Sequence, residues 1–569
     1  MIHIDMNKLK YILMSLAAVT ITSCADLGYN EASSRDEDWT YNSPINGVKA
    51  LVYDVYAQVP SEFKDSIYGS GALIASATDE AEFAHSYSPI QKYYNGGWTP
   101  SYPFADTWER SYRAITQIHM YLERIQHIDL SDYEYDPNYQ TMKQQFEIFP
   151  YELRFLRAYF YFELVRAYGD VPLVTTTLTN AQANSVKRTP AKDVFQFIID
   201  ELDAVAEYLP VSYNDVPGQE IGRATRGAAL ALKARVLLYE ASPLFNPGNN
   251  KELWKKAAAA SKVIIDNAPL WGYKLSKYAD LWGHESFTNP EFIFVLGTQA
   301  SNDFEKYNYP TGIENGNSGN CPTQSLIDAY EYQADGKTFK EKHPGNIDVT
   351  TEKPYEGLDP RFALTIVKNG DLWPSNAAQQ ISIETWQGGF NGAPKYGATP
   401  TGYYLKKFVD GNCVTTANNQ TTTRHNWIVM RLAEFYLNYA EAMYNYYGDA
   451  DAKGEFGMSA NEAINVLRRR PDIQMPEFKG SSNFMERYMR ERMVELAFEG
   501  HRFWDVRRWK KGPEFFRNID VADFKLDSNG ALILNRKTET RQWDDRYYLF
   551  PIPQSELKKN GNLTQNPNW

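Results

Sequence analysis

Residues 152–168 read ELRFLRAYFYFELVRAY, and this stretch decides the class of the fold. Its apolar side chains recur at the three- and four-residue spacing of an α-helix. They form two stripes, one of Leu153, Leu156, Phe160 and Leu164 and one of Phe155, Phe162 and Val165. Gly169 and Pro172 then end the pattern. Because both stripes have to be buried, the stretch predicts a helix that is packed on two sides.

Two later segments show the same helical period. Residues 190–209 follow Thr189 as the expected N-cap and place Pro190 in the first turn. One apolar face of this segment consists of Val194, Ile198, Leu202, Val205 and Leu209. Residues 225–241 are rich in alanine, and small side chains let neighbouring helices approach closely. Such helices are suited to stacked helical hairpins.

The C-terminal third continues this pattern. Helices are predicted over residues 428–447, 459–470 and 483–499, and Ser459 with Glu462 forms a capping box at the start of the second. Repeated helix pairs of this kind indicate a tetratricopeptide-like stack, although no repeat shows a complete consensus.

The segments between these blocks differ in composition. Residues 297–320, 341–360 and 370–426 are dense in Gly, Asn, Thr, Pro and aromatic residues, and they show no sustained period. The apolar run 292–296 is interpreted as a strand. The sequence therefore predicts a mainly α protein, with a tetratricopeptide-like helical-pair scaffold, long irregular loops and a few short strands. Loops of this length in an ordered protein usually carry function.

Composition limits the function classes. The chain has 569 residues, a net charge of -12 and a pI near 5.4, so no basic field attracts phosphates and nucleic acid is not an expected partner. Aromatic residues make up 14% of the chain, with 40 Tyr and 13 Trp. Tyrosine combines an apolar ring with a polar hydroxyl, which suits recognition surfaces.

The N-terminus is typical of an exported protein. Basic residues precede an apolar run over 11–21, which is too short to span a bilayer, and Cys24 follows directly. We therefore expect a signal peptide over 1–23, lipidation of Cys24, an acidic tether over 24–40 and one domain over 41–569. The alternative is a plain signal peptide with an incidental cysteine. Cys321 and Cys413 are either paired or two buried free thiols, and neither belongs to a metal-binding motif.

Ile21-Thr22-Ser23 before Cys24 is a loose version of the motif that precedes the lipidated cysteine of bacterial lipoproteins. Further characteristic blocks are RFLRAY at 154–159 with YGDVPL at 168–173, RGA at 226–228 with ARVLLY at 234–239, RLAE at 431–434 with YAEA at 439–442, RMVELAFEGHR at 492–502, YLFPIP at 548–553 and QNPNW at 565–569. Together, in this order and spacing, these blocks resemble the SusD/RagB family of surface lipoproteins that bind glycans for import.

The resemblance implies an all-helical core of tetratricopeptide-like pairs and a role as the lid over a SusC-like TonB-dependent barrel. The partners implied are a glycan and this transporter, with the membrane reached through the lipid alone. The matching blocks contain no catalytic residues, so no enzymatic activity is expected, and no cofactor or metal. Ligand identity is not carried by the resemblance, because the binding loops of the family differ.

Candidate ligand residues follow from the chemistry of sugars, which offer apolar ring faces and hydroxyl groups to flat aromatics and polar side chains. The loop 93–102, YYNGGWTPSY, supplies both kinds, and Trp98 between glycines and a proline is the first candidate. The alternative is that Trp98 packs under Trp108 and Tyr112. The full set of candidates is Trp98, Asn95, Tyr94, Asp79, Tyr307, Tyr309, Trp386 and Tyr396.

Two other functions remain open on the sequence. A glycoside hydrolase would use a pair of carboxylates such as Asp79 and Glu80, but adjacent residues do not by spacing alone flank a glycosidic bond. A helical-repeat adaptor would bind a protein or peptide on its concave face. Glu491, Glu495 and Glu499 stand at four-residue spacing among arginines and are interpreted as a structural ion-pair ladder.

Overall fold

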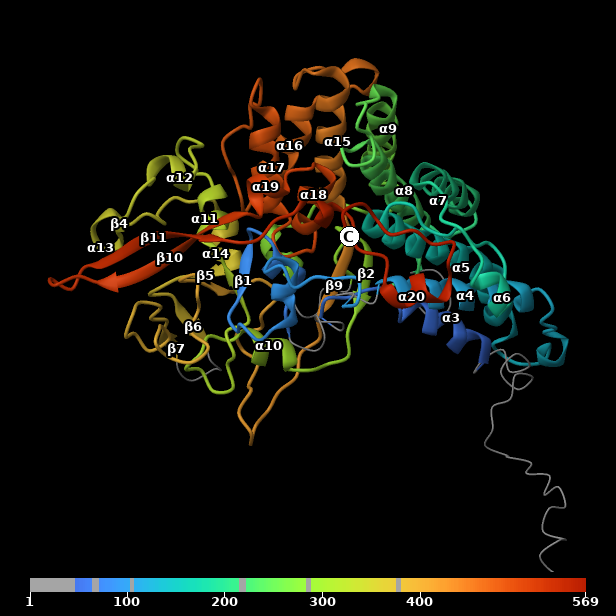
Figure 1. Ribbon diagram of the computed structural model, residues 1–569, viewed down its shortest axis with the longest axis horizontal. Helices are drawn as coiled ribbons and strands as arrows, with labels where there is room; N and C mark the ends of the chain where they lie inside the picture. Colours follow the sequence, from blue (N-terminus) through green and yellow to red (C-terminus); the bar gives the residue numbers. More distant parts are fainter. Residues whose placement is uncertain (1–46, 64–70, 103–106, 214–221, 283–287, 375–379) are drawn as a thin grey trace, which may run out of the picture.

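The computed structural model describes residues 47–63, 71–102, 107–213, 222–282, 288–374 and 380–569. The predicted signal peptide, Cys24 and the acidic tether lie outside these residues. Figure 1 shows helices gathered on one side of the molecule, with short strands and loops on the other. The mainly α architecture predicted from the sequence is confirmed.

Most helices of the scaffold pack in chain order, each against the next. They are α3 (Lys49–Tyr56), α4 (Thr107–Ile125), α5 (Tyr139–Tyr168), α6 (Asn180–Ala183), α7 (Ala191–Ala206), α8 (Arg226–Ala241), α9 (Lys251–Asn267), α15 (Leu432–Tyr447), α16 (Ala460–Arg468) and α17 (Phe484–Glu495). Contacts run from α4 to α5, α7, α8, α9, α15 and α16 in succession, with the very short α6 outside this series, while α17 contacts α15. This is the arrangement expected of stacked helical pairs.

The helix predicted over residues 152–168 is present as part of α5. Helix α5 is buried on nearly all sides between Glu152 and Tyr168, and both apolar stripes lie in the core. The helix also extends back to Tyr139, through Pro150, which the sequence pattern did not predict. Helix α8 places Ala228, Ala231 and Ala234 at zero exposure, and it packs between α7 and α9. The small side chains thus permit close helix packing.

Two predicted helix boundaries differ from those in the structure. Thr189 does not cap α7, because its backbone forms a bridge with Val171 and Pro190 itself occupies the N-cap position. Residues 426–431 form strand β9, and helix α15 begins only at Leu432. A fully buried strand has apolar residues on both faces, so its pattern cannot be distinguished from a buried helix. The capping box of Ser459 and Glu462 is confirmed.

The strands form small antiparallel sheets. They are β1 (Ala81–Phe83), β2 (Phe292–Gly297), β3 (Asn320–Pro322), β4 (Ile347–Asp348), β5 (Ile366–Val367), β6 (Leu372–Pro374), β7 (Gln380–Ser382), β8 (Tyr404–Leu405), β9 (Asn426–Arg431), β10 (Asn518–Leu526) and β11 (Leu532–Thr540). The pairs are β1 with β3, β2 with β9, β5 with β8 and β6 with β7, while β11 lies between β10 and β4. The long hairpin β10–β11, which projects at the left in Figure 1, was not predicted.

We call residues 297–426 the loop-rich region. Short helices interrupt it, and others follow α17: α10 (Asp303–Asn308), α11 (Gln324–Ala329), α12 (Phe339–Lys342), α13 (Val349–Glu352), α14 (Pro360–Thr365), α18 (Arg502–Arg508), α19 (Gly512–Phe515) and α20 (Gln554–Lys559). A separate apolar core joins this region to the end of α17 and to the β10–β11 hairpin. The loops are therefore anchored on packed side chains.

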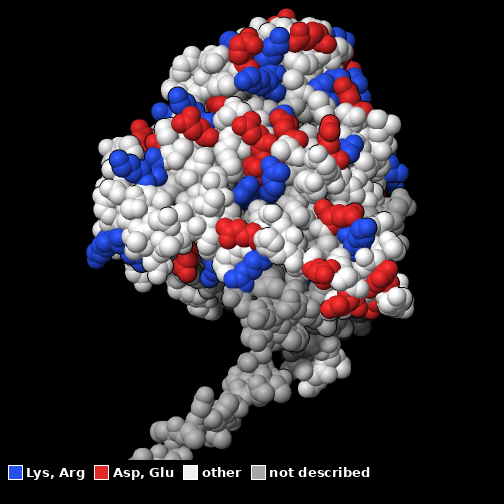
Figure 2. Space-filling model, turned by 90° about the vertical axis from the view of Figure 1, so that its right-hand side faces the viewer, with Lys and Arg blue, Asp and Glu red and all other residues white. Residues whose placement is uncertain are grey.

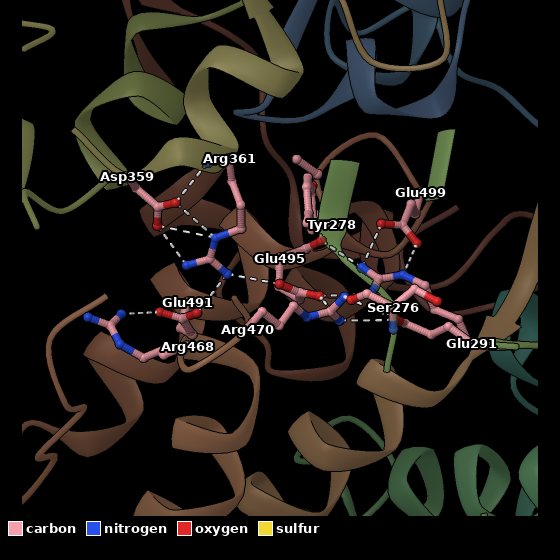
Figure 3. Close-up of polar contacts among 12 residues, drawn as sticks. Ser276, Tyr278, Glu291, Asp359, Arg361, Arg468, Arg470, Glu491, Glu495 and Glu499 are labelled. Atoms are coloured by element: carbon pink, nitrogen blue, oxygen red, sulfur yellow. Dashed lines mark hydrogen bonds and ion pairs between the residues drawn. The ribbon is translucent and has the colours of Figure 1, made fainter. Parts of the chain in front are cut away.

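A buried ion network joins the loop-rich region to the scaffold. Glu495 lies at its centre, and its carboxylate accepts hydrogen bonds from Arg361, Arg431 and Arg470 over 2.8–3.0 Å. Figure 3 shows Glu495 between Arg361 on one side and Arg470 on the other. The remaining members are Ser276, Tyr278, Glu291, Glu331, Asp359, Lys407, Arg468, Glu491 and Glu499.

The predicted ladder along residues 491–499 is thus a network with partners distant in sequence. The arginines next to these glutamates pair elsewhere: Arg492 with Asp505 and Arg502 with Asp79. Burial alone would raise the pKa of Glu495, but the guanidinium groups of Arg470, Arg431 and Arg361 lower that pKa to about 2. The carboxylate is therefore ionised at neutral pH.

Acid should weaken this network. A carboxyl group with an ordinary pKa of 4.5 and a folded pKa of about 2 contributes stability that is complete above pH 4.5 and is lost as the pH falls toward 2. We expect the thermal midpoint to fall over this window, and to fall less in Glu495→Gln, which has no such group. Glu486→Gln, on the exposed side of the same helix, should retain the wild-type slope. An identical slope in all three proteins would contradict the assignment.

Candidate functional site

The chain that leads to the candidate site is fixed by buried ion pairs. Asp79 accepts two hydrogen bonds from Arg502, at 2.9 and 2.7 Å. Glu82 in β1 pairs with Arg541 and accepts a hydrogen bond from the hydroxyl of Tyr94 at 2.8 Å. Strand β1 is therefore held in place before the chain emerges at the surface.

Two exposed tyrosines lie beyond β1, against one histidine. The Nε2 of His85, a buried residue, is 2.9 Å from the carbonyl oxygen of Asn317. Tyr87 stacks on the imidazole with 5.1 Å between ring centroids, and Tyr396 approaches the same ring at 5.3 Å. Tyr87 is 66% exposed and Tyr396 is 77% exposed. Both rings thus have a fixed backing and a free face.

A third exposed ring belongs to the same surface. Phe390 is 53% exposed, and the ammonium group of Lys395 lies 4.1 Å from the centre of its ring. The backbone N–H of Phe390 donates to the carboxylate of Glu384 at 2.9 Å. We call Tyr87, Phe390 and Tyr396 the exposed aromatic cluster.

The segment from Thr311 to Gly312 lies against the residues that carry two of the three rings, Tyr396 and Phe390. The hydroxyl of Thr311 donates to the carbonyl oxygen of Tyr396 at 3.0 Å. Gly312 has φ +94°, and a Cβ there would lie 2.8 Å from Nζ of Lys395 and 3.0 Å from the ring of Phe390. Gly397, with φ +72°, leaves the space that His85 occupies. These two glycines let the backbone pass directly beneath the aromatic side chains.

This arrangement suits a ligand with flat apolar faces and polar edges. Aromatic rings fixed on one side and open on the other can stack on the C–H face of a sugar ring without losing much side-chain entropy. Two partly buried hydrogen bonds, from His85 to the carbonyl oxygen of Asn317 and from Thr311 to that of Tyr396, hold the platform. The geometry favours binding and provides no reaction centre among the described residues of the cluster.

The structure separates the predicted ligand residues into two groups. Tyr396 and Asn95 are exposed, and Tyr307 and Trp386 are half-buried. Asn95 uses its side-chain oxygen to accept a hydrogen bond from the backbone of Gly97 at 2.9 Å. Only Tyr396 joins the exposed aromatic cluster.

Trp98 was the first candidate, and its predicted role as a stacking platform is wrong for this structure. The side chain is 1% exposed and packs against Tyr93, Tyr547, Phe550 and Trp569, with ring centroids 4.7–5.6 Å apart. The flanking glycines turn the backbone, but they turn Trp98 toward the C-terminal segment of the chain. Its neighbours also differ from the predicted Trp108 and Tyr112.

Three further candidates are buried and already bonded. The hydroxyl of Tyr309 donates to the carbonyl oxygen of Cys413 at 2.7 Å, that of Tyr94 donates to Glu82, and Asp79 is paired with Arg502. These residues are not available to a ligand at the surface. Their contacts are made inside the protein.

Tyr87 and Phe390 were missed by the sequence reasoning. Tyr87 lies in His85-Ser86-Tyr87-Ser88 just before Pro89, and Phe390 lies between Gly388-Gly389 and Gly392. A ring among small and polar residues next to glycine or proline is a signal of exposure, and it is present in both places. The same signal failed for Trp98, so it does not distinguish outward from inward rings.

The acidic residues 79–82 do not form an accessible pair of carboxylates. Asp79 and Glu82 are paired with arginines, and burial raises the pKa of Glu80 well above its ordinary value. Burial therefore favours the uncharged form of the Glu80 carboxyl group. The sequence offered Asp79 and Glu80 as the alternative hydrolytic pair, and neither side chain reaches the surface.

Asp79 is paired with Arg502, whereas burial favours the uncharged form of Glu80, so an amide substitution should affect the two residues differently. Glu80→Gln should leave the free energy of unfolding within about 1 kcal/mol of wild type, because an amide resembles a protonated carboxyl group. Asp79→Asn should be clearly more destabilising, because it leaves Arg502 buried without an anion. Urea unfolding at pH 7 measures both. Equal losses in the two variants would show that Glu80 is ionised.

The described residues provide no group of three or more His, Cys, Asp or Glu side chains that could hold a metal ion. Cys321 and Cys413 are free and buried, so they are not paired with each other. Burial raises the pKa of the Cys321 thiol to about 12 and that of Cys413 to about 11. Both thiols are therefore unreactive at neutral pH.

A cleft of about 610 Å³ lies on the scaffold side, between β2 and the segment after α9. Arg223 and Tyr273 line it, but Arg223 is paired with Glu152, and the hydroxyl of Tyr273 is 3.1 Å from that of Thr225. Arg223 and Tyr273 are thus already bonded within the protein. The exposed aromatic cluster is the better candidate for ligand contact.

Positive and negative side chains are mixed on the helical side of the molecule. Figure 2 shows Lys, Arg, Asp and Glu interspersed there, without an extended field of one sign on this face. None of the helices in the described part of the chain has the length and apolar character needed to cross a bilayer.

Two family models match the chain. The model described as "SusD family" matches residues 290–569, and the model described as "Starch-binding associating with outer membrane" matches residues 31–238. Among curated proteins, SusD-like protein P2 of Formosa agariphila is 25% identical over 433 residues, which is 72% of each chain. A SusD-like protein of Bacteroides ovatus is 25% identical over 454 residues, which is 73% of each chain.

Solved structures agree with these matches. A SusD-like protein from Bacteroides fragilis has a TM-score of 0.76 at 28% identity, covering 94% of this chain and 98% of the other. A laminarin-binding SusD-like protein has a TM-score of 0.59 at 21% identity, covering 93% and 99%. The second likeness shows the fold alone.

Proposed function

Because the chain belongs to the SusD/RagB family, we propose that it binds an oligosaccharide at the cell surface through the exposed aromatic cluster. The single observation that carries this proposal is the group of three outward rings, Tyr87, Phe390 and Tyr396, on loops fixed to the core. The family description "Starch-binding associating with outer membrane" supports a glycan as ligand.

We also propose that binding occurs without cleavage. The carboxyl groups nearest in sequence to Tyr87 are buried, and Asp79 and Glu82 are paired with arginines, which counts against the hydrolytic pair that the sequence suggested. A glycosidase needs two carboxyl groups that face the scissile bond. Nothing in the exposed aromatic cluster supplies such a pair.

The family also suggests how the protein is attached to the membrane and where the bound glycan goes. We propose that Cys24 is lipidated, that the lipid holds the protein at the outer membrane, and that the bound glycan is passed to a SusC-like TonB-dependent transporter. The phrase "associating with outer membrane" in the family description supports the location. Replacing Cys24 by serine should move the protein from the membrane fraction to the soluble fraction, and continued membrane attachment would count against the lipid anchor.

Calorimetric titration of the purified protein against plant, microbial and host oligosaccharides tests the proposed function. We expect saturable binding to one class of glycan, with no release of reducing ends during prolonged incubation. Release of reducing ends would support the hydrolase. Absence of binding to any glycan, together with capture of a peptide on the helical scaffold, would favour the adaptor.

A further inference from the structure

The exposed aromatic cluster has a cation, Lys395, at its edge. Lys395 is exposed, and among the residues that the structure describes no ion pair joins it to a carboxylate. The nearest carboxylate along this loop, Glu384, accepts a hydrogen bond from the backbone of Phe390. Glu314 is exposed in the adjoining segment but is not paired with Lys395 either. The ammonium charge is therefore available to a ligand.

The position of this ammonium group is fixed. Nζ of Lys395 donates to the carbonyl oxygen of Phe390 at 3.0 Å and lies over the ring of the same residue. It also lies above Gly312, where any Cβ would displace it. A lysine has three N–H donors, so two remain after this bond. A ligand anion would thus meet a charge whose orientation is already set, at a reduced cost in side-chain entropy.

A second lysine and aromatic ring are placed in the same way nearby along the chain. Nζ of Lys92 lies 3.8 Å from the ring centre of Tyr102, which is 63% exposed. Lys92 also has no ion pair among the described residues. It lies in the short helix η5 (Pro89–Tyr93), directly after Tyr87, and this helix is about 10 Å long at 2 Å per residue. Lys92 thus provides a second cation beside an exposed ring, five positions after Tyr87 in the chain.

From these contacts we propose that the exposed aromatic cluster selects oligosaccharides that carry anionic groups. The ammonium group of Lys395 binds the anionic group of the ligand. The anionic group is a uronic acid carboxylate or a sulfate ester, which present the same negative oxygens to an ammonium group. The inference rests on the proposed function, since it requires a glycan on the cluster. With a net charge of -12, the protein as a whole does not attract anions, so the preference has to be local.

Matched ligands separate charge from shape. Oligogalacturonate is compared with its methyl ester, which keeps the sugar rings and removes the charge. A sulfated galactan oligosaccharide is compared with its desulfated form in the same way. Calorimetric titration at low and at physiological salt gives the affinity for each. We expect each charged form to bind at least about tenfold more tightly than its neutral partner for the class that is recognised, with a smaller difference at the higher salt.

Variants assign the effect to one side chain. Lys395→Ala should remove the preference for the charged ligand and leave the affinity for the neutral form nearly unchanged, while Lys395→Arg should retain the preference. Lys143→Ala is the matched control, because it removes an exposed lysine of helix α5 and leaves the aromatic cluster intact.

The outcomes distinguish this inference from the proposed function. Equal affinities for charged and neutral forms, or a preference that survives in Lys395→Ala, would overturn the selection of anions while the glycan function stands. A preference for oligogalacturonate over its methyl ester would identify the anion as a carboxylate. A preference for the sulfated over the desulfated galactan would identify it as a sulfate ester. If neither these probes nor the plant, microbial and host oligosaccharides of the wider titration bind the wild-type protein, the proposed function itself fails.

Discussion

Replacing Glu495 by alanine is expected to lower the free energy of unfolding by roughly 3–5 kcal/mol. The carboxylate is fully buried and accepts hydrogen bonds from Arg361, Arg431 and Arg470. Without it, three guanidinium groups remain in the interior with fewer anions, and their desolvation is no longer offset. Urea unfolding at pH 7, followed by circular dichroism, measures the loss.

Glu486 provides the matched control, because it lies on the same helix and also pairs with an arginine. Its carboxylate is 69% exposed, and it lies 2.7 Å from Arg490. Exposed pairs of this kind contribute about 0–1 kcal/mol. Glu486→Ala should therefore unfold at nearly the wild-type urea concentration. If Glu495→Ala unfolds at the same concentration as Glu486→Ala, the network is not the connection between the scaffold and the loop-rich region.

The second large effect is expected on ligand binding. The double substitution Tyr87→Ala with Tyr396→Ala should weaken oligosaccharide binding by roughly 100-fold, because the loss of a central aromatic anchor costs about 2 kcal/mol or more. Both side chains project from the surface, so the free energy of unfolding should change little. Calorimetric titration measures the affinity, and circular dichroism confirms the fold.

Tyr135→Ala is the control for this substitution. Tyr135 is 94% exposed, lies outside the exposed aromatic cluster, and should not affect binding when removed. Full affinity in the double variant would place the ligand elsewhere. A loss of affinity that accompanies unfolding would assign the two tyrosines to stability.

Much of the scaffold could be predicted because its signals are local. The two stripes of α5, the alanines of α8 and the capping box of α16 each lie within a few turns of one helix. Strand β9 was assigned to a helix because six successive buried residues have no face to distinguish. The β10–β11 hairpin has the signal Asn529-Gly530 between apolar runs, and it was overlooked.

The site was predicted less well, because exposure depends on distant contacts. Trp98 and Tyr396 both lie next to glycines, yet Trp98 faces Phe550 and Trp569 while Tyr396 faces solvent. Those partners are hundreds of residues away. The ion network has the same character, since Arg361 and Glu495 are 134 positions apart. Residue spacing alone cannot assign such partners.

The most direct test of the glycan site is the crystal structure of the protein with the oligosaccharide that binds it most tightly. The account predicts sugar rings in stacking contact with Tyr87, Phe390 or Tyr396, on the surface formed by the loops around residues 85–87 and 390–397. An oligosaccharide seated in the cleft beside Tyr273, with all three of these rings in contact with solvent only, would contradict it.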